Sequence, residues 1–401
     1  MLISFIILLT SKAYAQVTIG SANQSSQGAL LDLKQQTDGS SYLGLGLPRV
    51  MLTNLTPTTD AELAKSIGST TSSYDKREHI GLLIYNVNED WCSATPIHPG
   101  MYVWNGSEWE KLPQDGIKAS PEVKYYTDTR PHGGAMADAK YSKTYPYRKF
   151  GDAGEWMLEN MRYIPAPQEP IQITPKDLGA NTKDKAYRYP TSKEVVSDFD
   201  KVPDTWTEKQ GLFYTYSAAT MGAWDHNDDA NDFGHGSSVE SQLPQIQGIC
   251  PPGWHVPTDR EWNELEAEIH NNAWKYSSFT AEEVAQWGTW KPAWDTEDSV
   301  RGNGHGNAMN SVCKVPETNP SSFIFGKSLP SALGGFDVLL VGGSTNAYEN
   351  IQLNWGKNAE YWSTSTGIGG ETAWYRRTTT GGELRRFAVF QTNMQLVRCK
   401  R

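Results

Sequence analysis

The sequence predicts an α+β fold with few helices, arranged in at least two domains. Turn residues and short apolar runs alternate over most of the chain, which is typical of β-structure. Against this background, signals for the start of a helix stand at Thr191, Thr258 and Thr280. The length of 401 residues exceeds what one hydrophobic core usually holds, so each half of the chain is expected to bury a core of its own.

The first residues have the pattern of a signal peptide. An apolar run at residues 2–9 is followed by Ala13, Tyr14 and Ala15, a triplet after which signal peptidase cleaves. The run is far shorter than the roughly 20 apolar residues of a membrane span, and no later stretch approaches that length. We therefore expect residues 1–15 to be removed on export. The mature protein, without a transmembrane span, is expected at the cell surface, outside the cell or in the periplasm.

Residues 16–112 are predicted to form a small, mostly-β module. Their short apolar runs end at Trp104, Asn105, Gly106 and Trp109, a pattern that predicts a tight Asn-Gly hairpin between aromatic strands. The stretch 113–149 then turns polar and mixes Pro, Gly, Lys and Tyr without a sustained period. We interpret it as a linker that leads into the second domain, residues 150–401.

The clearest local signal of the second domain predicts a helix. Thr258 and Glu261 have the spacing of a capping box, in which both side chains bind free backbone N–H groups at a helix start. Trp262, Leu265 and Ile269 follow at i, i+3 and i+7, which places them on one buried stripe. The same start signal predicts two further short helices, at Thr191 with Glu194 and at Thr280 with Glu283.

The charge distribution and the cysteine spacing disfavour nucleic-acid binding and CxxC-type redox or zinc sites. The net charge of -10 is dispersed along the chain, which disfavours binding to the phosphates of nucleic acids. The four cysteines allow three full pairings, and no two stand close enough for a CxxC redox or zinc motif. Export permits disulfides.

Catalytic motifs are absent from the sequence, which contains no H-E-x-x-H, G-x-S-x-G or P-loop. Glu261 and Glu264 could form a carboxylate pair, but Glu261 already has a capping role and Glu264 should face solvent. His255, between Trp254 and Val256, is interpreted as a packed histidine rather than a general base. The sequence therefore predicts a protein that is not an enzyme.

One acidic loop could bind calcium. It places hard oxygen ligands at Asp225, Asn227, Asp229, Asn231 and Asp232, the type that calcium prefers. The loop departs from the EF-hand template, because Ala and Gly occupy the places of the turn glycine and the closing glutamate. Both a calcium site and a solvated acidic loop remain open, and no other cofactor is expected.

Aromatic residues are concentrated in the C-terminal part of the chain, at Trp355, Tyr361, Trp362, Trp374 and Tyr375. Aromatic faces stack well on sugar rings, although such residues also build cores. Trp355 and Tyr361 stand beside polar residues. They are the candidates for ligand contact.

Seven short motifs follow one another in the second half of the chain. They are GEWMLENMRY (154–163), YTYSAATM (214–221), QGICPPGWHVPTDREWNELE (247–266), LPSALGG (329–335), YWST (361–364), WYR (374–376) and VRCK (397–400). In this order they resemble the Fibrobacter succinogenes major paralogous domain over residues 150–400. The resemblance implies a secreted or surface-associated protein of a bacterium such as the Bacteroidetes. It also implies that Trp362 and Trp374, which lie in the motifs, are structural.

Residues 256–262 and 396–398 also resemble the C-type-lectin-like fold and its formylglycine-generating relatives. In lectin-like folds a cysteine near the first helix commonly pairs with one in the last strand, which implies a Cys250–Cys399 disulfide. Cys92 and Cys313 would then be unpaired or link the domains. A formylglycine-generating enzyme needs a reactive cysteine pair in its C-terminal region, and Cys313 and Cys399 stand in unmatched contexts.

Three functions are compatible with these features. The first is an adhesin-like surface protein that binds a glycan or protein ligand without catalysis. The second is a structural or accessory subunit of a surface fibre or envelope assembly, with other envelope or fimbrial subunits as partners. The third, and the least supported, is an enzyme of the formylglycine-generating type.

Overall fold

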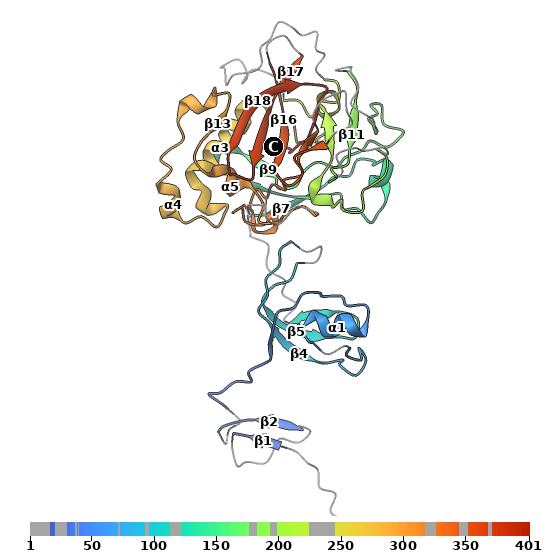
Figure 1. Cartoon of the computed structure of the whole chain (residues 1–401), viewed down its shortest axis with the longest axis vertical. Helices are drawn as coiled ribbons and strands as arrows, with labels where there is room; N and C mark the ends of the chain where they lie inside the picture. Colours follow the sequence, from blue (N-terminus) through green and yellow to red (C-terminus); the bar gives the residue numbers. More distant parts are fainter. Residues whose placement is uncertain are drawn as a thin grey trace, which may run out of the picture. The chain divides into compact units, whose positions relative to one another are not determined.

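The computed structural model describes most of the chain, namely residues 17–20, 30–36, 38, 40–70, 73–92, 96–112, 122–175, 183–192, 199–223, 245–316, 326–344, 352–367 and 371–401. The chain divides into two compact units, Met1–Gly116 and Ile117–Arg401 (Figure 1). Both contain helices and strands, so the predicted α+β class is confirmed. The signal-peptide prediction falls outside the described residues.

Among its described residues, the first unit contains two separate sheets. In one, β1 (Val17–Ile19) pairs in parallel with β2 (Leu31–Leu33). The other has the strand order β3-β4-β5-β6. Its strands are β3 (Arg49–Val50), β4 (Leu83–Asn86), β5 (Gly100–Trp104) and β6 (Trp109–Leu112), and α1 (Asp60–Ser66) lies between β3 and β4 in sequence. Trp104 and Trp109 are buried in a small core with Leu63 of α1.

The hairpin between β5 and β6 is present, and Trp104 faces Trp109 as predicted. Its connection, however, is longer than the predicted two-residue Asn-Gly turn, because residues 105–108 all lie outside the ladder. Asn105 closes this loop by accepting hydrogen bonds at its side-chain oxygen from the backbone N–H groups of Ser107 and Glu108, at 2.9 and 2.8 Å. The Asn105 side chain thus stabilises a four-residue loop in place of the two-residue Asn-Gly turn.

The second unit contains three sheets among its described residues. A three-stranded sheet consists of β7 (Lys124–Thr127), β8 (Thr144–Lys149) and β9 (Glu155–Met157). A six-stranded sheet has the order β10 (Thr174–Pro175), β11 (Ala186–Arg188), β12 (Phe213–Thr215), β19 (Met394–Gln395), β14 (Gly343–Ser344), β15 (Gln352–Leu353). A four-stranded sheet has the order β13 (Val300–Arg301), β18 (Leu384–Phe390), β17 (Thr372–Thr379), β16 (Asn358–Thr366).

The first of these sheets corrects the prediction of a linker at 113–149. Residues 122–149 contain β7, η1 and β8 and belong to the second unit. Tyr145 and Tyr147 of β8 are buried in a core with Met157 of β9. The segment looked irregular in sequence because it uses tyrosine, not aliphatic residues, to fill that core.

Among the described residues of the second unit, all helices but one are short. They are α2 (Tyr216–Ala219), α3 (Asp259–Asn272), α4 (Ala281–Ala285) and α5 (His305–Met309), with 3₁₀ turns η1 (Gly134–Ala137), η2 (Gly151–Ala153), η3 (Glu208–Gln210), η5 (Ala273–Lys275), η6 (Pro292–Asp295) and η8 (Ser331–Leu333). The capping boxes predicted at Thr258 and Thr280 are both present and start α3 and α4. The box predicted at Thr191 needs Glu194, which lies outside the described residues.

Helix α3 packs against β16 and β17, the C-terminal strands drawn in red in Figure 1. Its predicted stripe of Trp262, Leu265 and Ile269 is fully buried, as expected. The last residues of the chain reach a second core, which contains Met157, Val397 and Cys399. There the backbone N–H of Met157 donates to the carbonyl of Cys399 at 3.0 Å.

In the described part of the chain, no helix is both long and apolar enough to cross a membrane.

Candidate functional site

Helix α3 has a second buried stripe, made of polar side chains. Asp259, Asn263 and Glu266 stand at i, i+4 and i+7, next to the apolar stripe, and are almost inaccessible to solvent. Three buried arginines of the four-stranded sheet meet them, Arg301 of β13, Arg376 of β17 and Arg386 of β18. We call these six residues the buried charge network.

Arg376 lies at the centre of the buried charge network. Its guanidinium donates to Glu266 at 2.5 Å, to the Asp259 carboxylate at 2.6 Å and to the Asn263 side-chain oxygen at 2.7 Å. Burial alone would raise the pKa of Asp259, but the positive charges of Arg376 and Arg386 hold it below its usual value. The carboxylates therefore stay ionised and bind α3 to the sheet.

The acids and arginines of the buried charge network are hydrogen-bonded to one another, so its role is structural. Arg386 donates to both Asp259 oxygens, each at 3.0 Å, and Arg301 donates to Glu266 at 3.0 Å. The sequence analysis missed this network. The signal that could have found it is an arginine at an inward position of a strand, as Arg376 stands between buried Trp374 and Thr378.

Two buried histidines lie beside the network. His270 of α3 makes tilted or edge-to-face ring contacts, at centroid distances of 5.3–5.7 Å, with Trp287, Trp290, Trp294 and His305. Neither His270 Nε2 nor His305 Nδ1 has a hydrogen-bond partner among the described residues. Burial, followed by the neighbouring His305, lowers the pKa of His270 from 6.5 to about 4.

Acid is therefore expected to destabilise the second unit. Between pH 6.5 and 4 the unfolded chain binds a proton at His270 and the folded chain does not. The contribution of neutral His270 to the free energy of unfolding is fully present above pH 6.5. It decreases as the pH falls toward 4, by up to about 3 kcal/mol. Urea unfolding at pH 7.5, 6 and 4.5 measures the loss. The His270→Gln variant should lose less over this range, and an identical loss would contradict the assignment.

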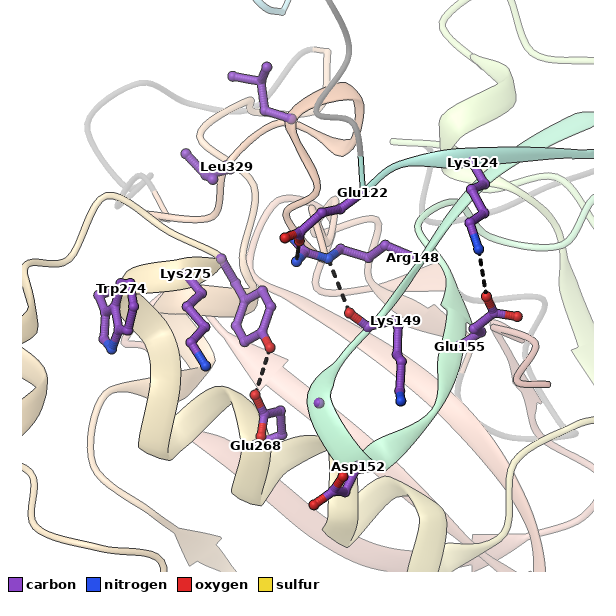
Figure 2. A pocket seen from close by; sticks show the side chains of 13 residues that line it. Glu122, Lys124, Arg148, Lys149, Asp152, Glu155, Glu268, Trp274, Lys275 and Leu329 are labelled. Carbon is purple, nitrogen blue, oxygen red and sulfur yellow. Dashed lines mark hydrogen bonds and ion pairs between the residues drawn. The ribbon is translucent and has the colours of Figure 1, made fainter.

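The second unit also contains an open hollow of about 880 Å³ (Figure 2). Residues from β7 to β9, from the end of α3 through η5, and from around η8 line it. They are Glu122, Lys124, Arg148, Lys149, Gly151, Asp152, Glu155, Glu268, Trp274, Lys275, Tyr276, Leu329 and Leu333. We call this space the charged hollow, because eight of these residues carry a charge.

Two buried side chains hold the wall of the charged hollow in place. The Arg148 guanidinium donates to the carbonyl of Gly334 at 3.1 Å, forms an ion pair with Glu122 and lies 4.8 Å from the ring centre of Tyr276. The Tyr276 hydroxyl in turn donates to Glu268 at 2.6 Å. Burial and this carboxylate raise the pKa of Tyr276, so the phenol stays protonated and keeps Glu268 oriented.

The mouth of the charged hollow carries exposed groups of three kinds. Trp274 is 48% exposed on η5, directly after α3. Lys149, Lys275 and Asp152 are exposed as well. In Figure 2, the side chains of Lys149 and Lys275 extend into the same space as Glu268. An aromatic face, two ammonium groups and two carboxylates can together bind a polar molecule that has an apolar ring face.

Comparison with known families identifies the second unit. Residues 151–399, more than half of the chain, match the family model of the Fibrobacter succinogenes major domain. The chain belongs to this family. Residues 18–124 match a different model, that of a phage tail like trimerisation region. No curated protein and no solved structure matches the chain.

The motifs of the Fibrobacter succinogenes major domain have defined places in the structure. Residues 247–266 supply Asp259, Asn263 and Glu266 of the buried charge network. Residues 329–335 form the turn that receives Arg148. In that turn, a side chain at Gly335 would collide with the carbonyl of Leu329, so the motif needs glycine there.

The domain contains the disulfide that the lectin-like resemblance implies. Cys250 and Cys399 are bonded, with their Cα atoms 5.8 Å apart, and both are fully buried. Cys92 and Cys313 are disulfide-bonded as well. The alternative in which these two are unpaired thiols is therefore wrong.

The two aromatic candidates for ligand contact do not form a surface. Tyr361 is 1% exposed, and its hydroxyl donates to the Asn160 side chain at 3.1 Å inside the core. Its proposed role in ligand contact is therefore wrong, because β16 is buried on both of its faces. Trp355 is partly buried against the same core and donates its indole N–H to the carbonyl of Pro316 at 2.8 Å. The sequence analysis did not identify Trp274, which is the exposed tryptophan at the charged hollow.

The proposed calcium ligands Asp225, Asn227, Asp229 and Asp232 lie outside the described residues. In the described part of the domain and of the first unit, no group of three or more His, Cys, Asp or Glu side chains could hold a metal ion. His255, interpreted as a packed histidine, is buried and lies 2.8 Å from a carboxylate oxygen of Glu261.

Proposed function

We propose that this chain is a non-catalytic cell-surface protein that assembles as a trimer through its first unit and presents its second unit as a binding head. The observation that carries the proposal is the apolar surface of the first unit. Apart from Val17, its residues lie within the segment that matches the trimerisation region.

The pair β1 and β2 cannot be stable by itself. It has two strands of three residues each, and two-stranded sheets are marginal in water even when they are longer. Val17 and Ile19 of β1 and Leu31 and Leu33 of β2 are all exposed. The structure of one chain thus leaves both strands with apolar side chains that lack a core. Equivalent strands of two further copies would supply one.

Exposed apolar side chains are concentrated throughout the first unit. Those among its described residues are Val17, Ile19, Leu30, Leu31, Leu33, Tyr42, Leu43, Leu45, Met51, Ile80, Leu83, Tyr85 and Val87. In the larger second unit, the exposed ones among the described residues are Tyr125, Ile171, Trp274, Val300 and Phe390. Monomeric proteins rarely expose large contiguous apolar patches, so this contrast favours an interface between copies in the first unit.

One face of the β3-β4-β5-β6 sheet of the first unit is also apolar and exposed. Leu83 and Tyr85 alternate along β4 with the buried Ile84 and Asn86, and Val87 continues the exposed series. The inner face already packs against α1 and the tryptophan pair. The outer face is thus available for a second copy.

The second unit has the features of a rigid head. Two disulfide-bonded cysteines and the buried charge network fix its core, and the bonded cysteines suit an oxidising compartment outside the cytosol. A lectin-like fold and a glycan or protein ligand are part of this proposal. A fibre subunit whose head binds no ligand is the alternative, and it is compatible with the same trimerisation segment. Ligand binding separates the two.

Mutation of the first unit is expected to dissociate the trimer. Light scattering of purified residues 16–401 should give three times the mass of one chain. The variant Ile19→Asp/Leu33→Asp is expected to be monomeric, because it would place six carboxylates in the apolar interface. Phe390→Asp, at an exposed apolar position of the second unit, is the matched control and should remain trimeric. A monomeric unmodified protein would overturn the proposal.

A further inference from the structure

We propose that the charged hollow binds an acidic sugar, whose ring stacks on Trp274 and whose carboxylate pairs with Lys149 and Lys275. The proposal rests on the binding head described above and names the class of ligand and the residues that select it.

Some charged residues of the charged hollow already have partners among the described residues, and others do not. Three of its acids already have partners, because Glu122 pairs with Arg148, Glu155 pairs with Lys124 and with Arg401, and Glu268 accepts from Tyr276. Lys149 and Lys275 make no ion pair with any described residue. Asp152 and Glu268 keep their negative charges, because Tyr276 is a neutral donor. The mouth therefore offers two ammonium groups for a ligand carboxylate beside two carboxylates for ligand hydroxyl groups.

Trp274 offers the surface for the sugar ring. An exposed indole is costly, since a buried tryptophan removes 150–250 Å² of surface from water. Trp274 stays 48% exposed although its neighbours Ala273 and Tyr276 are buried. The ammonium group of Lys275 lies 5.3 Å from its ring centre. A sugar ring on this indole would thus lie within reach of a positive charge.

The floor of the charged hollow offers acceptors for hydroxyl groups. Glu268 is held in one orientation by Tyr276, and the backbone of Gly151 lies against its carboxylate. A side chain at Gly151, whose φ is +47°, would come within 2.5 Å of that carboxylate. Glycine therefore keeps the floor open to Glu268. With Asp152 beside it, the site combines acceptors for hydroxyls with donors for a carboxylate.

The size of the charged hollow suits a short oligosaccharide. Its volume of about 880 Å³ lies within the range of about 300–1,000 Å³ found for small-molecule pockets. The mouth is open to solvent, which screens its charges, so one head should bind weakly. Three heads on a trimer would bind a polymer of acidic sugars more tightly through effective concentration.

The test is titration of the mature protein, residues 16–401, with tetragalacturonate and with its fully methyl-esterified form. The acid is expected to bind, and the ester, which has the same rings without the charge, is expected to bind at least ten times more weakly. The variants Lys149→Gln/Lys275→Gln and Trp274→Ala should each weaken binding of the acid tenfold or more. Lys149→Arg/Lys275→Arg should retain it. Binding of the acid should also weaken with added salt.

Two control variants test whether the loss of binding is confined to the charged hollow. Lys357→Gln and Phe390→Ala remove an exposed lysine and an exposed aromatic residue elsewhere in the second unit, and both should bind like the unmodified protein. No binding of the acid, equal binding of acid and ester, or unchanged binding by the lysine variant would overturn the inference. Light scattering of the same samples separates the two proposals. A trimer without binding refutes only the sugar site, whereas a monomer that binds refutes only the trimeric assembly.

Discussion

An Arg376→Met substitution is expected to destabilise the second unit by about 3–5 kcal/mol. Arg376 is fully buried and is shared by Asp259 and Glu266, two acids that are also fully buried. Methionine fills much of the space of arginine but leaves the two carboxylates with one positive partner fewer. The cost arises from the charges left behind, not from lost packing.

Urea unfolding followed by tryptophan fluorescence measures this effect. The matched control is Arg385→Met, because Arg385 lies on β18 beside Arg386 but pairs with Glu383 at the surface. Exposed pairs of this kind contribute about 0–1 kcal/mol, so the control should unfold almost like the unmodified protein. A loss below 1 kcal/mol for Arg376→Met would show that water or a rearranged Arg301 compensates the acids.

The elements that were predictable depend on neighbouring residues in the sequence. The capping boxes of α3 and α4 join residues three positions apart, and the stripe of Trp262, Leu265 and Ile269 follows from the period of one helix. The Trp104–Trp109 pair follows from one hairpin. In each case the physical cause is contained in a few consecutive residues.

The sites that were missed depend on residues far apart in the sequence. Asp259 and Glu266 are buried only because Arg376, 117 and 110 positions away, reaches them. Tyr361 stands beside polar residues in the sequence, yet its strand is buried throughout. Helix α3 packs against this strand, and Leu396 near the end of the chain pairs alongside it. The charged hollow likewise combines the segments 122–155, 268–276 and 329–333, whose approach no local pattern encodes.

Removal of the Cys250–Cys399 disulfide is expected to cost about 5 kcal/mol. The bond closes a loop with a sequence separation of 149, and the loss of loop entropy in the unfolded chain increases with loop length. The variant Cys250→Ala/Cys399→Ala tests this by urea unfolding against the unmodified protein. A matched control is the unmodified protein with dithiothreitol under native conditions. Both sulfurs are buried, so its fluorescence should not change until the protein unfolds.

Because the Cys250–Cys399 disulfide forms in an oxidising compartment, the stability of the second unit depends on where it folds. Domains of this kind are stable by about 5–15 kcal/mol, so a loss of about 5 kcal/mol removes a third or more of the total. The segment that Cys399 anchors also carries Lys400, which pairs with Glu261 at the start of α3 at 2.8 Å. A head expressed in a reducing cytosol is therefore expected to unfold at a lower urea concentration than the exported protein. Equal midpoints for the two preparations would show that the buried charge network and Lys400 hold the end of the chain without the disulfide.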